Sequence, residues 1–415
     1  MIPYNNDIAI ASYYEVVFNG EVAKLLPFGH SRHFPLSFNV KSKQIISGEV
    51  NFFNTNFYKE FNANNFLKED KYEIKKSKKN DSVIILNLLD NCFGHSLLKL
   101  FYSVNCFINY NKNNDFIIIL PKALEHFLFE INGVNKIVVN AKFSELEKCY
   151  ILNNAITEIS KEYSEVFLKG VETYESYNFN DLTGHLNLLN QNQSEIIKSK
   201  VVFYYRSDYW RKWEGNKQKK NIIKLFTFLK PFFNSSVEFC VVGDSDSEIF
   251  PDWMRDFRTK SFSPETDFKY NQLFNETLIC IGITGSHMLF PSLFSLCTAH
   301  LHPIFKYKNM AEDIVVNKSA NEALSAYKHL YYYGNQNCSD VSPDKLAVLL
   351  VSHFAGLIEK EYKISSLSED QNTWLKQTYQ CFNYKTYIEY KKSLNKRAND
   401  KTKWNYYFDK LRIFK

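Results

Sequence analysis

Long apolar runs alternate with stretches of helical periodicity through the first half of the chain. Residues 83–89 (VIILNLL), 116–121 (FIIILP) and 134–140 (VNKIVVN) have the nearly unbroken apolar character of strands buried on both faces of a parallel sheet. Between them, LLKLFYSVNCFINY and ALEHFLFEI place apolar residues at helical spacing. The order strand, helix, strand, helix, strand predicts a doubly wound parallel unit.

A second series of the same kind begins at residue 200. KVVFYYR (200–206) and VEFCVVG (237–243) read as strands, NIIKLFTFLKPFF and EIFPDWMRDF as helical segments, and a further buried strand lies within residues 276–296. The sequence therefore predicts an α/β fold with two Rossmann-like parallel-sheet lobes in series.

The two ends of the chain have different patterns. YYEVVFNGEV, with its Asn-Gly turn signal, and QIISGEVNFF predict short strands near the start, whereas the segment after Ile364 reads as mostly helical. We divide the chain into a β-rich prefix (1–78), an N-terminal Rossmann-like lobe (79–199), a C-terminal Rossmann-like lobe (200–364) and a basic helical tail (365–415).

Composition supports a large globular core and locates the charge. Of 415 residues, 45% are hydrophobic and 16% aromatic, which excludes a disordered or low-complexity chain. The formal net charge is +6, and residues 365–415 alone hold 11 basic and 5 acidic side chains. The remainder is therefore neutral, and we expect no nucleic-acid partner.

The sequence predicts a cytoplasmic protein. No basic segment followed by an apolar segment opens the chain, and no apolar run is long enough to span a bilayer. The eight cysteines are dispersed without a C-x-x-C pair, and several lie within apolar strands. This usage fits a reducing compartment and suggests neither a zinc site nor a disulfide framework.

The turn in ETLICIGITGSHMLF is the first candidate site. Thr284, Gly285, Ser286 and His287 follow a buried strand and precede a helix, so their backbone N–H groups could hold a phosphate. Gly285 permits a close approach of a ligand to the backbone, and the hydroxyl and imidazole groups could add donors. The alternative is ordinary capping of a core helix by Ser286.

Basic residues follow the first strand of the same lobe. Arg206 and Lys212 come directly after KVVFYY, and ligands of open α/β sheets bind beyond the carboxyl ends of strands. Cations there would neutralise a diphosphate, and arginine can do so with two hydrogen bonds. The alternative is a solvated basic loop.

Over residues 83–354, this order of elements resembles the GT-B glycosyltransferases, particularly bacterial heptosyltransferase-like enzymes of surface-polysaccharide synthesis. TGSHM (284–288) stands where that group has a turn whose amides hold the nucleotide diphosphate, although its Gly and His occupy altered positions. The match is mainly topological. The resemblance implies that residues 200–364 form a nucleotide-sugar lobe and residues 79–199 an acceptor lobe. It also implies a nucleotide-sugar donor, a saccharide or lipid-linked acceptor, and no further cofactor.

The resemblance also implies a base in the first lobe that deprotonates the acceptor hydroxyl. The turn after residue 89 offers Asp90 and His95, and we expect one of them to have this role. The alternative is that Asp90 or Asn91 caps the following helix.

The sequence GDSDS contains a formal D-x-D pair, Asp244 and Asp246, of the type that binds a divalent cation in other glycosyltransferases. Because another strand and turn follow it within the lobe, we interpret it as a strand-to-helix connection and expect no bound metal. A metal-dependent transferase, a nucleotide-sugar epimerase of GT-B fold and a non-catalytic carbohydrate-binding module remain the alternatives.

The tail ends in an apolar stripe with helical spacing, flanked by lysine and arginine. We expect it to dock on the core, and a basic helix of this kind could also touch the inner face of a membrane. The stripe consists of Trp404, Tyr407, Phe408, Leu411 and Phe414.

Overall fold

The structure is a computed structural model, and the chain divides into two compact units. One comprises residues 1–189 with 315–319, the other residues 190–314 with 320–415. The residues described are 2–3, 14–18, 21–25, 37–39, 45–47, 72–90, 92–110, 112–129, 133–143, 155, 158–159, 161–168, 179–189, 198–208, 212–247, 249–304, 315, 328–361 and 380–398.

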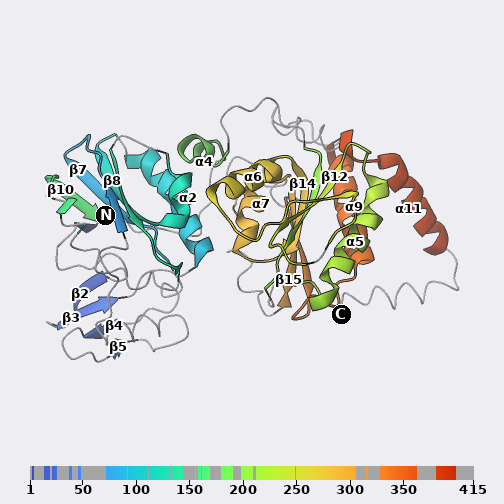
Figure 1. Cartoon of the computed structure of the whole chain (residues 1–415), viewed down its shortest axis with the longest axis horizontal. Coiled ribbons are helices and arrows are strands. Elements are labelled where there is room, and N and C mark those ends of the chain that lie inside the picture. The colour runs from blue at the N-terminus through green and yellow to red at the C-terminus, as the bar shows by residue number, and fades with distance from the viewer. Residues whose placement is uncertain are drawn as a thin grey trace. The chain divides into compact units, whose positions relative to one another are not determined.

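The first unit is built on a six-stranded sheet of order β1-β10-β7-β8-β9-β6 (Figure 1). Its four central strands are parallel, and the two outer strands pair antiparallel. The strands are β1 (Ile2–Pro3), β6 (Tyr72–Lys75), β7 (Ser82–Asn87), β8 (Asn114–Pro121), β9 (Val134–Val139) and β10 (Glu165–Leu168). The apolar runs of the sequence form the buried centre of this sheet, as predicted.

Helix α2 (Phe93–Tyr110) connects β7 to β8, and α4 (Phe179–His185) follows β10. The helix predicted over ALEHFLFEI is shorter than expected, since only the 3₁₀ segment η3 (Lys122–Phe127) forms after Pro121. The short strand β10 was not predicted, because a four-residue strand carries too little periodicity to be recognised.

A separate four-stranded antiparallel sheet confirms the β-rich character of the prefix. Its strands are β2 (Tyr14–Phe18), β3 (Glu21–Leu25), β4 (Ser37–Asn39) and β5 (Ile45–Ser47). The predicted hairpin is the β2–β3 pair. Strands β1 and β6, also from the first 78 residues, belong instead to the sheet of the first unit.

The second unit contains a six-stranded sheet of order β13-β12-β11-β14-β15-β16, in which all neighbouring strands are parallel. The strands are β11 (Lys200–Tyr205), β12 (Glu238–Gly243), β13 (Met254–Asp256), β14 (Thr277–Ile283), β15 (Cys297–Pro303) and β16 (His329–Gly334). The two Rossmann-like lobes predicted from the sequence are therefore confirmed. The helix predicted over EIFPDWMRDF is wrong, because its end pairs with β12 as strand β13.

Helices cover the second sheet. Helices α5 (Gln218–Leu229), α9 (Pro343–Glu361) and α11 (Tyr384–Ala398) share one core cluster with the strands and lie together beside the sheet (Figure 1). The 3₁₀ segment η6 (Gly215–Lys217) precedes α5, and η7 (Lys230–Phe232) follows it. Helix α6 (Pro264–Asn275), the 3₁₀ turn η8 (Ser286–Met288) and α7 (Leu289–Phe294) complete the unit. Trp213 is the largest fully buried side chain of this unit.

The structure also bears on membrane spanning, cysteines and the tail. Within the described ranges, no helix is both long and apolar enough to cross a bilayer. Seven cysteines in this part of the chain are free thiols. Helix α11 agrees with the predicted helical tail, whereas the apolar stripe over 404–414 lies outside the described residues.

Candidate functional site

The carboxyl ends of β11 and β14 bring two of the predicted site elements to one edge of the second sheet. These strands are parallel neighbours, with Tyr204 opposite Gly282. Arg206 follows β11 and the 284–287 turn follows β14, so both lie where open α/β sheets bind ligands.

A glycine lets the turn pack tightly on the sheet. A Cβ atom at Gly282 would lie 2.6 Å from the sulfur of Met288 and 3.3 Å from Cβ of Tyr204, so a larger residue would force the buried Met288 side chain to shift. The amide of Met288 donates to the Gly285 carbonyl at 2.8 Å, which closes the turn.

The backbone amides of Gly285 and Ser286 are available to a ligand. Gly285 is extended, with φ 158° and ψ 170°. Among the described residues, no hydrogen bond satisfies the N–H of Gly285 or Ser286. Two adjacent donors after a parallel strand are suited to an anion such as a phosphate.

The side chains of the turn have different environments. Thr284 is fully buried, and its amide donates to the Leu301 carbonyl at 3.0 Å. The His287 ring packs 4.6 Å from the Tyr204 ring, measured between centroids, and is also buried. The Ser286 side chain is partly exposed to solvent. Thr284 and His287 therefore position the turn, and the Ser286 hydroxyl can reach a ligand together with the two amides.

Arg206 is held by two carboxylates. Its Nε donates to Oδ2 of Asp244 at 3.0 Å, and its Nη2 lies 3.1 Å from Oδ2 of Asp208. The Arg206 side chain keeps 23% of its surface exposed. Lys212 is partly exposed, and the structure shows no ion pair for it within the described residues. Both predicted cations thus lie beyond the end of β11.

Both carboxylates of the D-x-D motif form ion pairs with arginines. Asp244 binds Arg206, and Asp246 accepts from Nη1 of Arg258 at 2.8 Å and from the Tyr205 hydroxyl. Arg258 also lies 4.8 Å from the centre of the Tyr205 ring. In the described part of the chain, no cluster of three His, Cys, Asp or Glu side chains has a metal-binding arrangement.

Gly243 makes the bend that places Asp244. Its φ is +104°, and a Cβ atom there would lie 2.1 Å from the Tyr205 carbonyl oxygen. The amide of Asp244 donates to the same oxygen at 3.0 Å, and the Tyr270 hydroxyl accepts from the Gly243 amide at 3.1 Å. Sequence reasoning missed Arg258 and Tyr270, which support this edge from loops and helices distant along the chain.

In the first unit, Asp90 and His95 meet at the start of α2. His95 Nδ1 lies 3.3 Å from Oδ1 of Asp90, and Lys99 Nζ lies 2.8 Å from Oδ2. The carboxylate is fully buried, the imidazole is 9% exposed and the lysine 3%. Burial alone would raise the pKa of Asp90, but the charge of Lys99 and the hydrogen bond and charge of His95 hold it well below its ordinary value.

Asp90 also caps the beginning of α2, since its Oδ1 accepts from the Cys92 amide at 3.0 Å. The predicted capping alternative is therefore present alongside the pairing with His95. Lys99 was missed in the sequence, although it stands alone among the apolar residues of its helix, which is the signal that could have found it.

Two further histidines of the second unit, His300 and His302, lie in β15. His300 is fully buried, with Nε2 3.2 Å from Oγ1 of Thr298, and burial lowers its pKa to about 3, so the ring is neutral. His302 is equally buried. The pair His30 and His33 lies outside the described residues.

Comparison with known proteins gives structural similarity only. No protein-family model and no curated protein sequence matches the chain. Three solved structures similar to it are E. coli heptosyltransferase WaaC with ADP, E. coli ADP-heptose LPS heptosyltransferase II and a glycosyl transferase family 9 protein from Veillonella parvula. Their TM-scores are 0.41, 0.38 and 0.39, with identities of 8%, 9% and 8%. They cover 66%, 66% and 67% of this chain and 99%, 98% and 99% of their own.

Proposed function

We propose that this chain is a glycosyltransferase that binds a nucleotide sugar at the carboxyl edge of the second sheet. The observation that carries the proposal is the pair of amides at Gly285 and Ser286 without hydrogen-bond partners in the described structure, beside a cation at the end of the neighbouring strand. Amides and an arginine together are the groups that stabilise a diphosphate. The acceptor we propose is a saccharide or a lipid-linked saccharide of surface-polysaccharide or glycoconjugate synthesis.

In the proposed reaction, an acceptor hydroxyl attacks the anomeric carbon of the donor while the bond from that carbon to the diphosphate oxygen breaks. Negative charge develops on the leaving diphosphate, where the Gly285 and Ser286 amides and the Ser286 hydroxyl donate hydrogen bonds. Arg206 is already paired with Asp208 and Asp244, so its contribution depends on turning its exposed part toward the diphosphate. Lys212 supplies a second cation.

We propose His95 as the base that receives the acceptor proton, with Asp90 as its positioning residue. The Asp90 carboxylate is fully buried and bound to Lys99, which keeps it from contacting a substrate directly. With His95 Nδ1 turned toward that carboxylate, Nε2 is the nitrogen suited to accept a proton.

We propose that the transfer needs no bound metal. Support comes from the ion pairs of Asp244 and Asp246 with arginines, since a divalent cation would have to displace both arginines to gain the two carboxylates. We also propose a cytoplasmic location with peripheral membrane contact through the basic tail, supported by the exposed lysines of α11.

The test is a thermal-shift screen of the full chain against nucleoside diphosphates and their sugar conjugates. We expect one nucleotide class to raise the melting temperature, with or without EDTA, and Arg206→Ala and Ser286→Ala to reduce the shift. Arg255→Ala is the control, because this exposed arginine lies on the edge strand β13 and pairs with Glu238 of the neighbouring strand β12, away from the turn. If no nucleotide stabilises the wild type, the donor site is wrong.

Product analysis separates the alternatives. A transferase releases nucleotide only in proportion to acceptor consumed, whereas an epimerase of the same fold releases nucleotide and free sugar without an acceptor. A carbohydrate-binding module would bind glycan with no nucleotide response. Loss of the nucleotide response or of turnover in EDTA would favour the metal-dependent D-x-D alternative.

A further inference from the structure

Among the described residues, the helical layer beside the second sheet has a surface on which lysines outnumber acidic side chains. On α5, η7, α9 and α11, the described acidic side chains at the surface are Asp344 and Glu389. The described lysines at the surface of the same elements are Lys219, Lys220, Lys224, Lys230, Lys345, Lys385, Lys391 and Lys392. We call this surface the basic layer. Its three helices pack on a common core, so they form one side of the unit (Figure 1).

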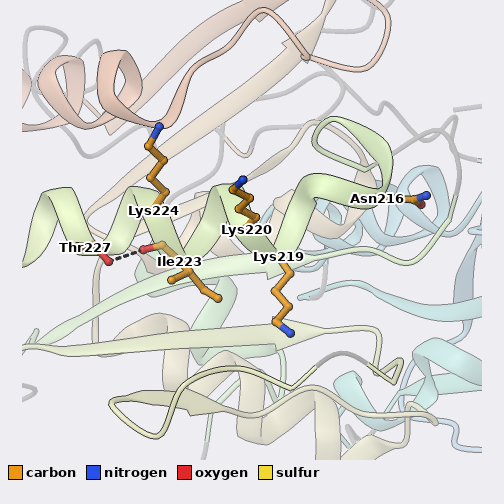
Figure 2. A pocket seen from close by; sticks show the side chains of 6 residues that line it. All are labelled: Asn216, Lys219, Lys220, Ile223, Lys224 and Thr227. Carbon is orange, nitrogen blue, oxygen red and sulfur yellow. Dashed lines mark hydrogen bonds between the residues drawn. The ribbon is translucent and has the colours of Figure 1, made fainter.

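A hollow runs along the exposed face of α5. Figure 2 shows the residues that line it, with Lys220 and Lys224 one helical turn apart and extending in the same direction. Its volume is about 510 Å³. The lining residues are Asn216, Lys219, Lys220, Ile223, Lys224 and Thr227. The hollow thus offers several ammonium groups to an anionic group of the size of a phosphate.

The lysines of α5 are placed where they destabilise the isolated helix. Lys219 and Lys220 lie in its first turn, which contains no acidic residue, although the amino end of a helix favours negative charge. Lys220 and Lys224 also repel each other across one turn. Glu214, just before η6, pairs with Lys217 and interacts with Lys220, which offsets part of this charge. An anionic partner would offset the repulsion that remains.

Aromatic side chains accompany these lysines. Phe228 is 40% exposed, with Lys224 Nζ 5.9 Å from its ring centre, and Trp253 is 38% exposed, with Lys230 Nζ at 4.9 Å. Lysines beside exposed aromatic rings are typical of protein surfaces that lie at a bilayer interface.

The sequence beyond α11 extends the same chemistry. Seventeen residues follow Ala398, and they include the apolar stripe from Trp404 to Phe414 and a total of five lysines and arginines. The chain therefore leaves the basic layer in a segment whose composition also suits an anionic bilayer.

We propose that the basic layer docks on an anionic membrane surface, with phospholipid headgroups at the lysines of α5 and η7. The proposal deepens the proposed function, because a membrane is where a lipid-linked acceptor would lie. It assigns the contact to a folded helical face.

Co-sedimentation with vesicles tests the proposal on the full chain. We expect binding to vesicles containing phosphatidylglycerol, little binding to pure phosphatidylcholine, and weaker binding as salt rises. The triple variant Lys220→Gln, Lys224→Gln, Lys230→Gln should bind roughly 100-fold more weakly at low salt, since each lysine near such a surface contributes several-fold. The control Lys112→Gln, Lys260→Gln, Lys269→Gln removes the same charge from exposed lysines elsewhere and should bind nearly as the wild type.

Three results would overturn the proposal. The first is that both triple variants bind anionic vesicles equally weakly. The second is that the Lys220, Lys224 and Lys230 variant binds vesicles like the wild type, and that binding is lost only when the chain is truncated after Ala398. The third is that the protein binds a single-stranded nucleic acid more tightly than anionic vesicles. Nucleotide-induced thermal shifts, measured on the same variants, report the donor site separately, so a failure of membrane docking and a failure of the proposed function can be distinguished.

Discussion

The Asp90 carboxylate and the Lys99 ammonium group form a buried ion pair, with Oδ2 and Nζ 2.8 Å apart and side-chain exposures of 0% and 3%. The pair joins the carboxyl end of β7 to the second turn of α2. Lys99 Nζ also donates to the Leu89 carbonyl at 2.8 Å, so the lysine holds the strand end as well as the carboxylate. This arrangement fixes the turn that presents His95.

Removing one partner of this pair should destabilise the protein strongly. We expect Asp90→Asn to lower the free energy of unfolding by about 3–5 kcal/mol at pH 7, because Lys99 is left buried and unpaired. Adding Lys99→Met should recover part of the loss. Asp81→Asn, at an 84% exposed carboxylate paired with Lys78, should change stability by less than about 1 kcal/mol. Urea denaturation measures each value.

The same pair should give a pH dependence of known sign. Because the folded-state pKa of Asp90 lies below its unfolded value of 3.8, its stabilising contribution is present above about pH 4 and is lost as pH falls. The stability difference between wild type and Asp90→Asn should therefore shrink between about pH 4 and pH 2. A difference that stays constant over this range would contradict the assignment.

Lys198 and Lys328 should give a pH dependence of the same sign near neutrality. Burial lowers the pKa of Lys198 to about 7, with a further contribution from Lys328, whose own pKa falls to about 8. Since the unfolded value is 10.5, the folded chain binds fewer protons between pH 7 and 10, and stability rises with pH in that window.

Lys198→Met should flatten this rise. We expect the slope of unfolding free energy against pH, measured by urea titration between pH 7.5 and 9.5, to fall by up to about 1.4 kcal/mol per pH unit. The variant should also lose the hydrogen bonds to the Asn275 and Phe294 carbonyls, which shifts the whole curve. Parallel curves for variant and wild type would show that Lys198 keeps an ordinary pKa in the fold.

Gly243→Ala should disrupt the site edge. The added Cβ would lie 2.1 Å from a backbone carbonyl at a φ of +104°, so we expect a loss of more than about 2 kcal/mol in unfolding free energy. Gly356→Ala, within α9, is the matched control, because its Cβ meets nothing within 4 Å and alanine favours helix by about 1 kcal/mol. Thermal unfolding distinguishes the two, and equal effects would contradict the bend assigned to Gly243.

The sequence predicted most of the parallel strands, because runs such as VIILNLL and TLICIGI are apolar on both faces. Strands β10 and β13 were not predicted because they are short, and β16 was not predicted because it is a partly exposed outer strand without a buried apolar run. All three form through pairing with neighbours already in the sheet. Local pattern carries no information about such pairing.

The turn after β14 was recognisable from Thr284, Gly285 and Ser286, whose residue types suit an anion-binding turn. The ion pairs that surround it were not, because Arg206 and Asp244 are 38 positions apart and meet only through the order of β11 and β12. The same strand order explains why a formal D-x-D motif forms arginine pairs, which the sequence alone did not reveal.

Hydrogen exchange of the full chain, with and without the nucleoside diphosphate that stabilises it most, tests the central claim directly. We predict slower exchange in peptides covering residues 282–290 and 204–208, and unchanged exchange on the basic layer and in β7 and β8. Protection confined to other segments, or no nucleotide that alters exchange at Gly285 and Ser286, would contradict a nucleotide-sugar site at this edge of the second sheet.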